Sequence, residues 1–496
     1  MRILAKLEKS IGCWFLIIIS VIFFILRLPS LYEPNWYGDE GIYQTLGIAM
    51  NAGKLLYRDA FDNKPPLLYF LYSLVSSDQF AIRFLSLITG ILAIAAFYFL
   101  AKKLLKNRKA IFISTGVFAI LFGLPLIEGN IANAENFMLL PNILAAVLVF
   151  QSLKTDIMQN KRNILLLFAG LILGISFLLK IVAVFDFSAF FVFLIFTNSS
   201  KSFLDIFKIK NLFRELKIIL PFILGFLLPI FLIALFFLIN NAFPYFLKAV
   251  LFNNVSYVNY GNKFLIPQGL LIFKIILLLL FTLFVFSKRK IYGNSFTFVF
   301  LWFGFSLFNA YFSQRPYTHY LLVLLPSFSL MLGLFILNKN FSKLSGIVLL
   351  TAFIALLLSF NFYTKTASYY QNFVSFLLEQ KSVYSYQRFF DKNTPNDYDL
   401  AGYINLRSLP SDNIFIWGNN AQVYKLTEKL PPGRYTVAYH ITSYKDGLEN
   451  TRNALLTSNP KFIIIMPNVG PYPFSLSDYF LKINLNGIKI YEKFYK

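Results

Sequence analysis

The chain has 496 residues, of which 57% are hydrophobic and only 14% are charged. Its mean hydropathy of +0.62 lies far above that of a soluble globular protein, so the composition predicts an integral membrane protein. A single cysteine, Cys13, excludes an intrachain disulfide. The net charge of +23 comes largely from lysines and arginines in short segments between apolar runs, which indicates membrane topology and argues against a nucleic-acid partner.

Apolar runs recur along the first three quarters of the chain, and most are near the ~20 residues that cross a bilayer as a helix. The sequence therefore predicts an α-helical polytopic membrane protein with about eleven transmembrane helices. The first run lacks a small-residue cleavage site, so it is expected to stay in the protein. The expected spans are 11–28, 82–101, 110–127, 137–153, 163–179, 181–197, 218–240, 269–287, 296–312, 321–338 and 345–361.

Positive charge alternates between the segments that separate these spans. With a cytoplasmic N-terminus, the inward segments carry roughly 21 lysines and arginines and the outward ones about seven, which fixes the orientation in a plasma membrane. The tail then lies outside the cytoplasm. The outward loops are 29–80, 128–136, 241–268 and 313–320.

Two outward loops contain apolar pieces that are too short to span a bilayer. Pro66 to Val75 and Phe243 to Val258 are expected to form helices at the membrane interface. Such helices beside a charged loop can form a groove for the polar head of a lipid whose tail stays in the bilayer.

Hydropathy falls after Asn361, which divides the chain into a predicted membrane domain, 1–361, and a tail, 362–496. The tail alternates short β-like runs with polar, helix-compatible stretches and is expected to form a small extracytoplasmic α/β domain. The three β-like runs are Asn413 to Trp417, Lys461 to Met466 and Ile488 to Tyr491.

Asp39 and Glu40 follow Gly38 in the first outward loop. A carboxylate at the mouth of a membrane cavity can act as a general base, or can hold a divalent cation with a second acid. Acids at a helix start also complement the helix dipole, so a structural role is an equal alternative. Lys64 stands before two prolines that fix its backbone, where it could bind a phosphate or reach to lipid headgroups.

Further charges lie in or beside the other outward loops. Glu128 and Glu135 have no basic residue within their loop, so they need a cation, a proton or a substrate hydroxyl, although Glu135 also suits a helix start. Lys180 and Asp186 could form a structural ion pair. The last outward loop offers Arg315 for phosphate, with His319 and the tyrosines Tyr317 and Tyr320, which suit sugar hydroxyls or an aromatic belt equally.

Several familiar motifs are missing from the sequence. It has no Walker A motif, no Rossmann glycine fingerprint, no HExxH and no clustered Cys/His ligands. ATP hydrolysis, dinucleotide chemistry and zincin-type proteolysis therefore have no local support.

The motifs YGDEGIYQ, FDNKPPLLYF, NAENFMLLP and RPYTHYLLVLLP, in this order, resemble those of GT-C superfold membrane glycosyltransferases. The resemblance is to the bacterial relatives of dolichyl-phosphate-mannose protein mannosyltransferases and of the lipid A aminoarabinose transferase. It implies an inverting hexosyl- or pentosyltransferase that takes a polyprenyl-phosphate-linked sugar on the extracytoplasmic face. The acceptor could be lipid-linked, glycan or protein.

The resemblance also implies roles for individual residues. Asp39 looks like the catalytic base, with Glu40 beside it, and Lys64 and Arg315 resemble donor-phosphate contacts. Glu135 looks like a site-shaping acid. No cofactor is required, but a divalent cation on Asp39 or Glu135 stays open, although Asn63 stands where some relatives have an acid. Further residues expected to shape the site are Asn133, Arg58, Asp62, Lys180, Tyr317, His319 and Tyr320.

Two other functions fit the membrane character. A transporter or flippase of polyprenyl-linked glycans would need charges at mid-membrane depth and an internal repeat, and neither is evident in the sequence. A glycan-binding scaffold with a membrane anchor leaves the acidic loops unexplained.

Overall fold

The computed structural model describes residues 2–154, 157–198, 209–254, 262, 268–337, 339–467 and 469–494. Contacts along the chain divide it into two compact units. The membrane unit comprises Met1–Leu28, Leu85–Phe236 and Phe252–Thr366. The tail unit comprises Pro29–Phe84, Phe237–Leu251 and Ala367–Lys496. The first long loop therefore groups with the C-terminal residues rather than with the helices that flank it in sequence.

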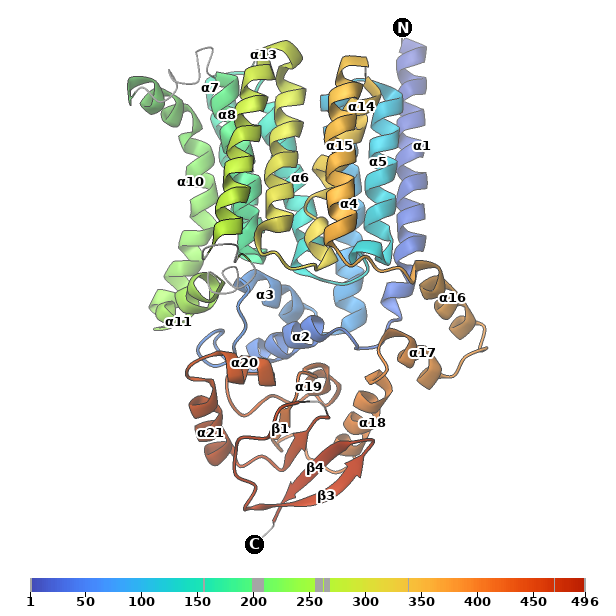
Figure 1. Ribbon diagram of the computed structural model, residues 1–496, viewed down its shortest axis with the longest axis vertical. Coiled ribbons are helices and arrows are strands. Elements are labelled where there is room, and N and C mark those ends of the chain that lie inside the picture. The colour runs from blue at the N-terminus through green and yellow to red at the C-terminus, as the bar shows by residue number, and fades with distance from the viewer. Residues whose placement is uncertain are drawn as a thin grey trace. The chain divides into compact units, whose positions relative to one another are not determined.

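The membrane unit is a bundle of long helices that lie side by side (Figure 1). Neighbouring pairs in contact include α6 with α7, α8 with α13, and α14 with both α5 and α15. The helices that make up most of this unit are α1 (Arg2–Arg27), α4 (Gln79–Leu105), α5 (Arg108–Gly123), α6 (Ala134–Gln151), α7 (Gln159–Leu179), α8 (Val184–Asn198), α10 (Ile209–Ile239), α13 (Gly269–Phe312), α14 (Leu325–Leu337) and α15 (Lys339–Ser359).

Seven helices among the described residues are long and apolar enough to cross a membrane. Two of the eleven expected spans lie in the 44-residue helix α13, whose backbone turns at Gly293 with φ of +79°. Three others coincide with helices α5, α8 and α14, which are shorter. The chain is thus a multi-pass membrane protein, as predicted, while eleven spans remain a prediction.

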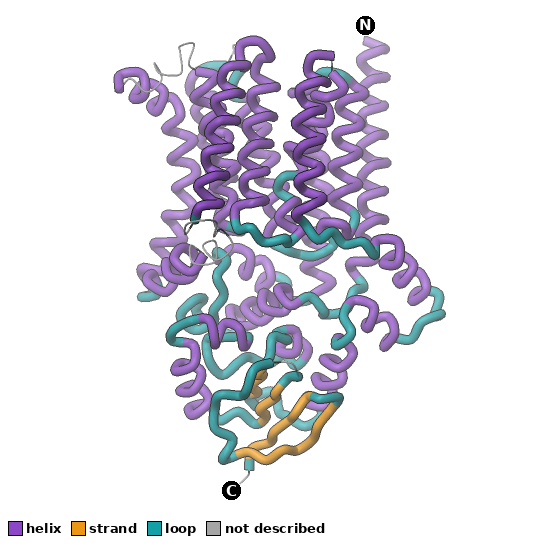
Figure 2. Tube along the Cα trace, viewed as in Figure 1, coloured by secondary structure: helices purple, strands orange, loops and turns teal. Residues whose placement is uncertain are grey.

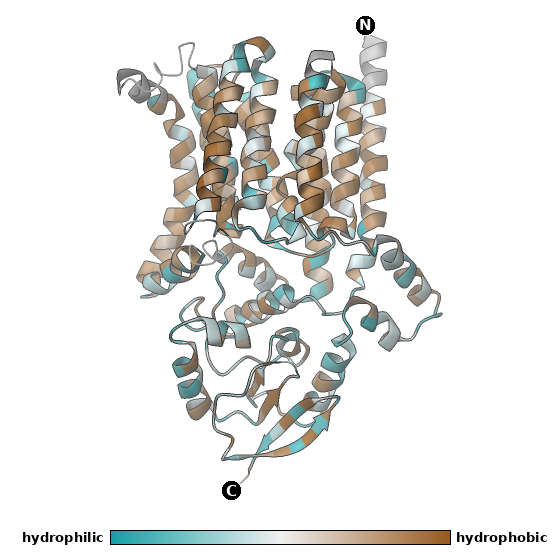
Figure 3. Cartoon of the chain, in the orientation of Figure 1, coloured by the Kyte–Doolittle hydropathy of each residue, from teal (hydrophilic) through white to brown (hydrophobic). Residues whose placement is uncertain are grey.

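The long helices of this unit consist largely of hydrophobic residues, as hydropathy colouring shows (Figure 3). On α10, Phe231 and Leu232 are more than half exposed, and Leu279 and Leu280 on α13 are equally open. Surfaces of this kind are unfavourable in water and favourable against lipid tails. The helix surface therefore supports the membrane assignment independently of helix length.

The tail unit contains the only sheet among the described residues, drawn in orange in Figure 2. The strands are β1 (Ile414–Trp417), β2 (Phe462–Ile465), β3 (Tyr479–Leu485) and β4 (Ile488–Lys493), in the order β1-β2-β4-β3. β1 and β2 are parallel, and the other pairs are antiparallel. The helices of this unit are α2 (Gly38–Asn51), α3 (Pro66–Leu74), α11 (Phe243–Leu247), α16 (Thr366–Leu377), α17 (Val383–Phe390), α18 (Thr394–Asn405), α19 (Gln422–Leu426), α20 (Ala438–Ser443) and α21 (Gly447–Ser458).

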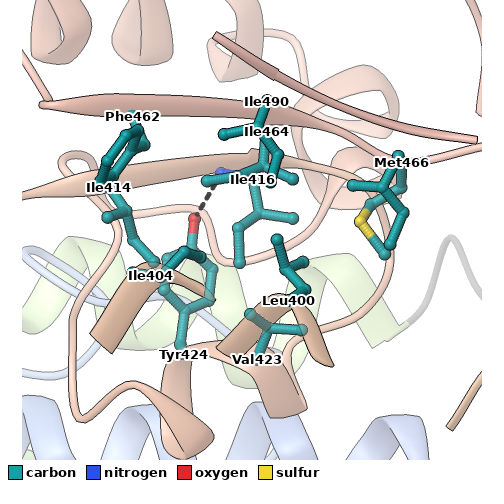
Figure 4. Packing of buried hydrophobic residues seen from close by; sticks show 11 residues of the cluster. Leu400, Ile404, Ile414, Ile416, Val423, Tyr424, Phe462, Ile464, Met466 and Ile490 are labelled. Carbon is teal, nitrogen blue, oxygen red and sulfur yellow. Dashed lines mark hydrogen bonds between the residues drawn. The ribbon is translucent and has the colours of Figure 1, made fainter. Parts of the chain in front are cut away.

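One face of the sheet packs on α18 and α19 through buried apolar side chains (Figure 4). Ile416 of β1 and Ile464 of β2 are fully buried there, with Leu400 from α18 and Val423 from α19. The hydroxyl of Tyr424 accepts a hydrogen bond of 3.0 Å from the backbone nitrogen of Ile416. The predicted small α/β domain is confirmed, with a core of its own.

The strand β3 was not expected from the sequence, whereas the three predicted β-like runs match β1, β2 and β4. β3 is joined to β4 by Asn486 and Gly487, both with positive φ. An Asn-Gly pair of this kind favours a two-residue hairpin turn, so the signal was present in the sequence. Apolar alternation in 479–485 is weak because this strand is mostly exposed.

The two short apolar pieces of the outward loops are helical where the structure describes them. Pro66–Leu74 forms α3, and Phe243–Leu247 forms α11, followed by a π-helical turn at Lys248–Phe252. Their placement at a membrane interface remains a prediction. Residues 255–258 of the second piece, and 255–261 and 263–267 of the expected loop 241–268, lie outside the described residues.

Candidate active site

Lys64 lies between two carboxylates of the tail unit. Its ammonium nitrogen is 3.6 Å from Oδ2 of Asp39 and 3.6 Å from Oδ2 of Asp62. The ring of Tyr43 covers the same ammonium at 4.8 Å, a distance at which a cation is attracted to the ring face. This cluster brings together three residues that the sequence predicts at the site, two carboxylates and one cation.

Asp39 is held on the first turn of α2, where the free backbone N–H groups favour an ionised carboxylate. Tyr43, one turn later, donates a hydrogen bond of 3.1 Å to Oδ2 of Asp39. The Asp39 side chain is 39% exposed, whereas that of Asp62 is 2% exposed. Asp39 is thus the more accessible of the two acids in this cluster.

Asp62 is buried and fixed by neutral donors. The Tyr69 hydroxyl donates to Oδ2 of Asp62 at 2.8 Å, and the backbone N–H of Asn63 donates to Oδ1 at 2.8 Å. Burial and the Asp62 charge raise the pKa of Tyr69 well above its usual value, so this tyrosine keeps its proton. Asp62 supplies the buried negative charge that balances Lys64.

The backbone of Lys64 is held from both sides. Its carbonyl accepts a hydrogen bond of 2.8 Å from the hydroxyl of Tyr57, and its N–H donates to the hydroxyl of Tyr69 at 3.1 Å. Pro65 then caps helix α3 in an extended conformation, and Pro66 takes the first helical position, which proline tolerates because no hydrogen bond is lost there. The KPP element therefore places the lysine rigidly, as its sequence predicts.

His440 on α20 is a member of this cluster that the sequence does not predict. Its Nε2 lies 3.7 Å from Oδ1 of Asp62, and the side chain is 3% exposed. Burial lowers the pKa of His440 to about 4, while the Asp62 charge opposes this shift and Lys64 adds to it. The imidazole is therefore neutral at pH 7. Some 380 residues separate His440 from Asp62 in sequence, and no local pattern marks it as a site residue.

Glu40 points into a second, buried ion cluster. Arg83 donates to both carboxylate oxygens of Glu40, at 3.1 and 2.5 Å, and pairs with Glu33 at 2.8 Å. Tyr369 and Trp36 complete the coordination of Glu33 with hydrogen bonds of 2.6 and 2.8 Å. Glu40 is 3% exposed, so this geometry suits a structural role better than the catalytic role expected beside Asp39.

Helix α2, which carries Asp39, packs closely against Ala421 and Gln422 at Gly41. A Cβ atom at Gly41 would stand 2.5 Å from the backbone nitrogen of Gln422, a contact that side chains do not tolerate. The hydroxyl of Thr45 reaches the carbonyl of Ala421 at 3.3 Å. The tail residues thereby set the position of the helix that bears Asp39.

A separate polar cluster lies in the membrane unit. Lys180 forms an ion pair with Glu135, and Nε2 of His319 lies 3.9 Å from the same carboxylate. Nδ1 of His319 is 3.0 Å from Glu128, whose other oxygen accepts a hydrogen bond of 2.8 Å from Thr318. The ring of Tyr320 covers the Lys180 ammonium at 4.4 Å. Four residues expected at the site, Glu135, Lys180, His319 and Tyr320, are in contact here.

The expected ion pair between Lys180 and Asp186 is replaced by other contacts. Lys180 turns to Glu135, while Asp186 accepts hydrogen bonds from Asn142 at 3.0 Å and from the indole of Trp302 at 2.6 Å. A buried carboxylate is stabilised by such neutral donors when no cation reaches it.

The remaining expected residues are less closely engaged with these clusters. Asn133 is buried at the start of α6, and its side-chain nitrogen has no hydrogen-bond partner among the described residues. The ring of Tyr317 stacks on His319 and is 46% exposed. Arg58 is exposed and pairs with Asp59 at 2.8 Å, outside the Lys64 cluster. Arg315 is partly buried, just before the short helix Thr318–Leu321.

A divalent cation would need several carboxylate or imidazole ligands in one place. Within the described ranges, no group of three Asp, Glu, His or Cys side chains is arranged to hold a metal ion. Asp39 and Glu135, the two acids proposed as ligands, belong to different units. The Lys64 ammonium already lies between Asp39 and Asp62, so the Asp39 cluster is a poor fit for a metal.

Comparison with known proteins identifies the fold. Residues 63–224 match the family model described as dolichyl-phosphate-mannose-protein mannosyltransferase. The crystal structure of ArnT from Cupriavidus metallidurans in the apo state is 13% identical, with a TM-score of 0.55, and the match covers 97% of this chain and 98% of that chain. ArnT from the same organism bound to undecaprenyl phosphate gives a TM-score of 0.52 at 12% identity, with the same coverage. No curated protein sequence matches significantly.

An archaeal oligosaccharyltransferase, AglB from Archaeoglobus fulgidus, also matches, at 14% identity over 92% of this chain and 69% of that chain, with a TM-score of 0.49. The likeness to ArnT extends over nearly the whole chain. The predicted architecture, a GT-C membrane region with a small C-terminal domain, is therefore confirmed.

Proposed function

We propose that this protein is a membrane glycosyltransferase that moves a sugar from a polyprenyl-phosphate donor to an acceptor hydroxyl on the extracytoplasmic face. The observation that carries the proposal is the cluster in which an accessible acid, Asp39, lies beside a fixed cation, Lys64, 3.6 Å away. The family-model match and the fold shared with ArnT, one structure of which holds undecaprenyl phosphate, support the same reaction class.

In this reaction the acceptor oxygen attacks the anomeric carbon while the bond from that carbon to the phosphate oxygen breaks. The electron pair of that bond leaves with the polyprenyl phosphate, and the acceptor proton passes to the carboxylate of Asp39. A single displacement of this kind inverts the anomeric centre. Phosphate is a good leaving group, so the protein mainly orients the acceptor, removes one proton and stabilises the departing charge.

Lys64 is the proposed counter-charge for the leaving phosphate. Two carboxylates lie 3.6 Å from its ammonium, and the hydrogen bonds of its backbone fix where the ammonium lies. Arg315, whose planar guanidinium matches phosphate oxygens, is proposed as a second donor-phosphate contact. Asp62 and His440 are positioning residues that hold Lys64 and its surroundings.

The membrane-unit cluster is proposed to shape the substrate site rather than to carry the proton transfer. Its acid, Glu135, is neutralised by Lys180 and approached by His319, so it is a weaker base than an acid open to the acceptor. The exposed ring of Tyr317 is available for stacking on a sugar. Asn133 and Tyr320 are proposed to contribute hydrogen bonds to the substrate.

The test is transfer or hydrolysis of radiolabelled sugar from a panel of polyprenyl-phosphate sugars by the purified full chain and by Asp39→Asn. We expect the variant to lose about 10²–10⁴-fold in turnover, the usual contribution of a general base. Asp78→Asn is the matched control, because Asp78 is exposed and caps the backbone of Ala81, which asparagine can also do.

Full activity in Asp39→Asn would show that another group takes the proton. Absence of turnover with every donor, together with specific binding of a lipid-linked glycan, would instead favour a transporter or flippase.

A further inference from the structure

A polar hollow of about 440 Å³ lies in the tail unit, apart from the Lys64 cluster. One wall comes from the loop after α2, with Lys54 and Arg58, and from the segment around Arg434. The other wall is α21, which contributes Asn450, Asn453 and Thr457. Apart from Gly433, only Pro432 and Ala454 among the lining residues lack a polar side chain. The proposed reaction uses none of these side chains.

Positive charge predominates in this hollow. Lys54, Arg58 and Arg434 face one lining acid, Asp59, which pairs with Arg58 at 2.8 Å. Lys54 makes no ion pair with any residue that the structure describes, and burial lowers its pKa. An anion placed beside Lys54 would offset the desolvation that lowers this pKa. The hollow therefore favours a ligand with a negative group.

Arg434 is built into the wall of the hollow. It is 7% exposed, and its guanidinium stacks near the rings of Phe61 and Tyr435, at 5.2 and 4.9 Å. One terminal nitrogen pairs with Asp446 at 3.3 Å, while its Nε is buried and has no partner within the described part of the chain. The arginine is thus held in one orientation and retains an unused donor, as a binding residue requires.

The α21 wall carries groups that suit sugar hydroxyls. Asn450, Asn453 and Thr457 follow each other at intervals of three and four residues, so they share one face of the helix. The amides of Asn450 and Asn453 form no hydrogen bond with the described residues, and each can donate and accept. Thr457 donates to the carbonyl of Asn453 at 2.8 Å and keeps its acceptor lone pairs.

We propose that this hollow binds an anionic glycan, with a phosphate or carboxylate on Lys54 and Arg434 and the sugar hydroxyls on the α21 amides. Free amides beside cations match a charged saccharide better than a lipid, since Pro432 and Ala454 are the only apolar side chains among the lining residues. This glycan is the proposed acceptor of the sugar. That role rests on the proposed function, whereas the binding of the glycan does not.

The test measures binding to the full chain in neutral detergent by titration calorimetry, with glucose 6-phosphate as the probe. Glucose and inorganic phosphate are the two half-ligands, and short-chain phosphatidylglycerol represents a lipid headgroup. We expect glucose 6-phosphate to bind at least about tenfold more tightly than any of the three, because it engages both walls.

Two substitutions test the two walls. Asn453→Glu brings a like charge to the ligand anion, and Lys54→Gln removes a cation; each should weaken binding about tenfold. Leu456→Glu is the matched control, because it adds the same charge to an exposed position of α21 that does not line the hollow. The affinity of the Leu456→Glu variant for glucose 6-phosphate should equal that of the wild type.

Equal binding of inorganic phosphate, tighter binding of the lipid headgroup, or unchanged affinity in Asn453→Glu would overturn the proposal. The readout needs no sugar donor, so it is separate from the test of the reaction. If the chain binds glucose 6-phosphate as expected but turns over no donor, the result would support this binding site and contradict the proposed function.

Discussion

Asp39 and Glu40 are adjacent in sequence and differ completely in environment. Successive residues of a helix point about 100° apart, so α2 directs Asp39 towards Lys64 and Glu40 towards Arg83. The sequence selects both acids and cannot tell them apart, because the partner of Glu40 lies 43 residues away. Exposure separates their proposed roles, since the proposed base must be reachable by the acceptor and a carboxylate in a buried ion pair is not.

Glu40→Gln should lower stability rather than act on the chemistry. It leaves part of the Arg83 charge buried without its partner, which typically costs about 3 kcal/mol. Thermal unfolding of the purified chain in detergent measures this loss, with Asp39→Asn as the comparison that should unfold near the wild-type temperature. A Glu40→Gln variant with normal unfolding and no turnover would instead give Glu40 a chemical role.

Lys64→Gln should reduce turnover about 100-fold, because it removes the cation proposed to receive the leaving phosphate. The same assignment predicts that EDTA leaves wild-type activity unchanged, since Lys64 occupies the space between Asp39 and Asp62. Donor turnover with and without EDTA measures this. Activity that disappears in EDTA and returns with Mn²⁺ would show that a metal supplies the charge.

Helices α7 and α10 approach each other through glycines. A Cβ atom at Gly170 would overlap the carbonyl oxygen of Phe222, and one at Gly225 would overlap that of Leu167. In a membrane the hydrophobic effect does not drive helices together, so their association depends on close packing. Small residues at a helix crossing allow that packing. The sequence predicts both helices from their apolar runs but does not reveal which helices cross.

Gly225→Ala should therefore destabilise the membrane unit by about 1–3 kcal/mol through overpacking against α7. Gly116→Ala on α5 is the control, because nothing lies within 4 Å of the position that its Cβ would take. This control should be neutral or slightly stabilising, since alanine favours a helix over glycine. Equal unfolding temperatures for the two variants would contradict the close crossing of α7 and α10.

The compact units of the folded chain do not follow the order of the sequence. The first loop and the C-terminal residues form one unit, in which Lys64, His440 and the hollow beside α21 are assembled. Two buried titratable groups of this unit respond to pH in opposite ways. Burial lowers the pKa of His440 to about 4 and raises that of Asp397 to about 6, although Asn420 and Gln422 donate hydrogen bonds to Asp397.

The contributions of His440 and Asp397 to the free energy of unfolding should largely cancel between pH 4 and 6. His440 binds fewer protons in the folded than in the unfolded chain, so its contribution to stability falls as pH drops below 6.5, by about 1.4 kcal/mol per unit. Asp397 binds more protons when folded, so its contribution rises as pH drops through 6, by a similar amount.

Single variants should separate the two effects in unfolding temperatures measured at pH 7 and pH 5. Asp397→Asn should lose stability at pH 5 relative to pH 7, because only the His440 contribution remains. His440→Gln should gain stability over the same interval. The same pH response in both variants would show that other groups control the acid stability of the chain.

The sequence by itself determined the membrane character, most helices, the small α/β tail and the local element that fixes Lys64. These features depend on composition, on apolar periodicity and on the backbone restriction of Pro65 and Pro66, which are local properties. Only the tertiary structure decided that Glu40 is buried with Arg83, that Lys180 pairs with Glu135, and that His440 joins Asp62. These contacts join residues between 43 and 378 positions apart, and packing of the whole chain sets which distant side chains meet.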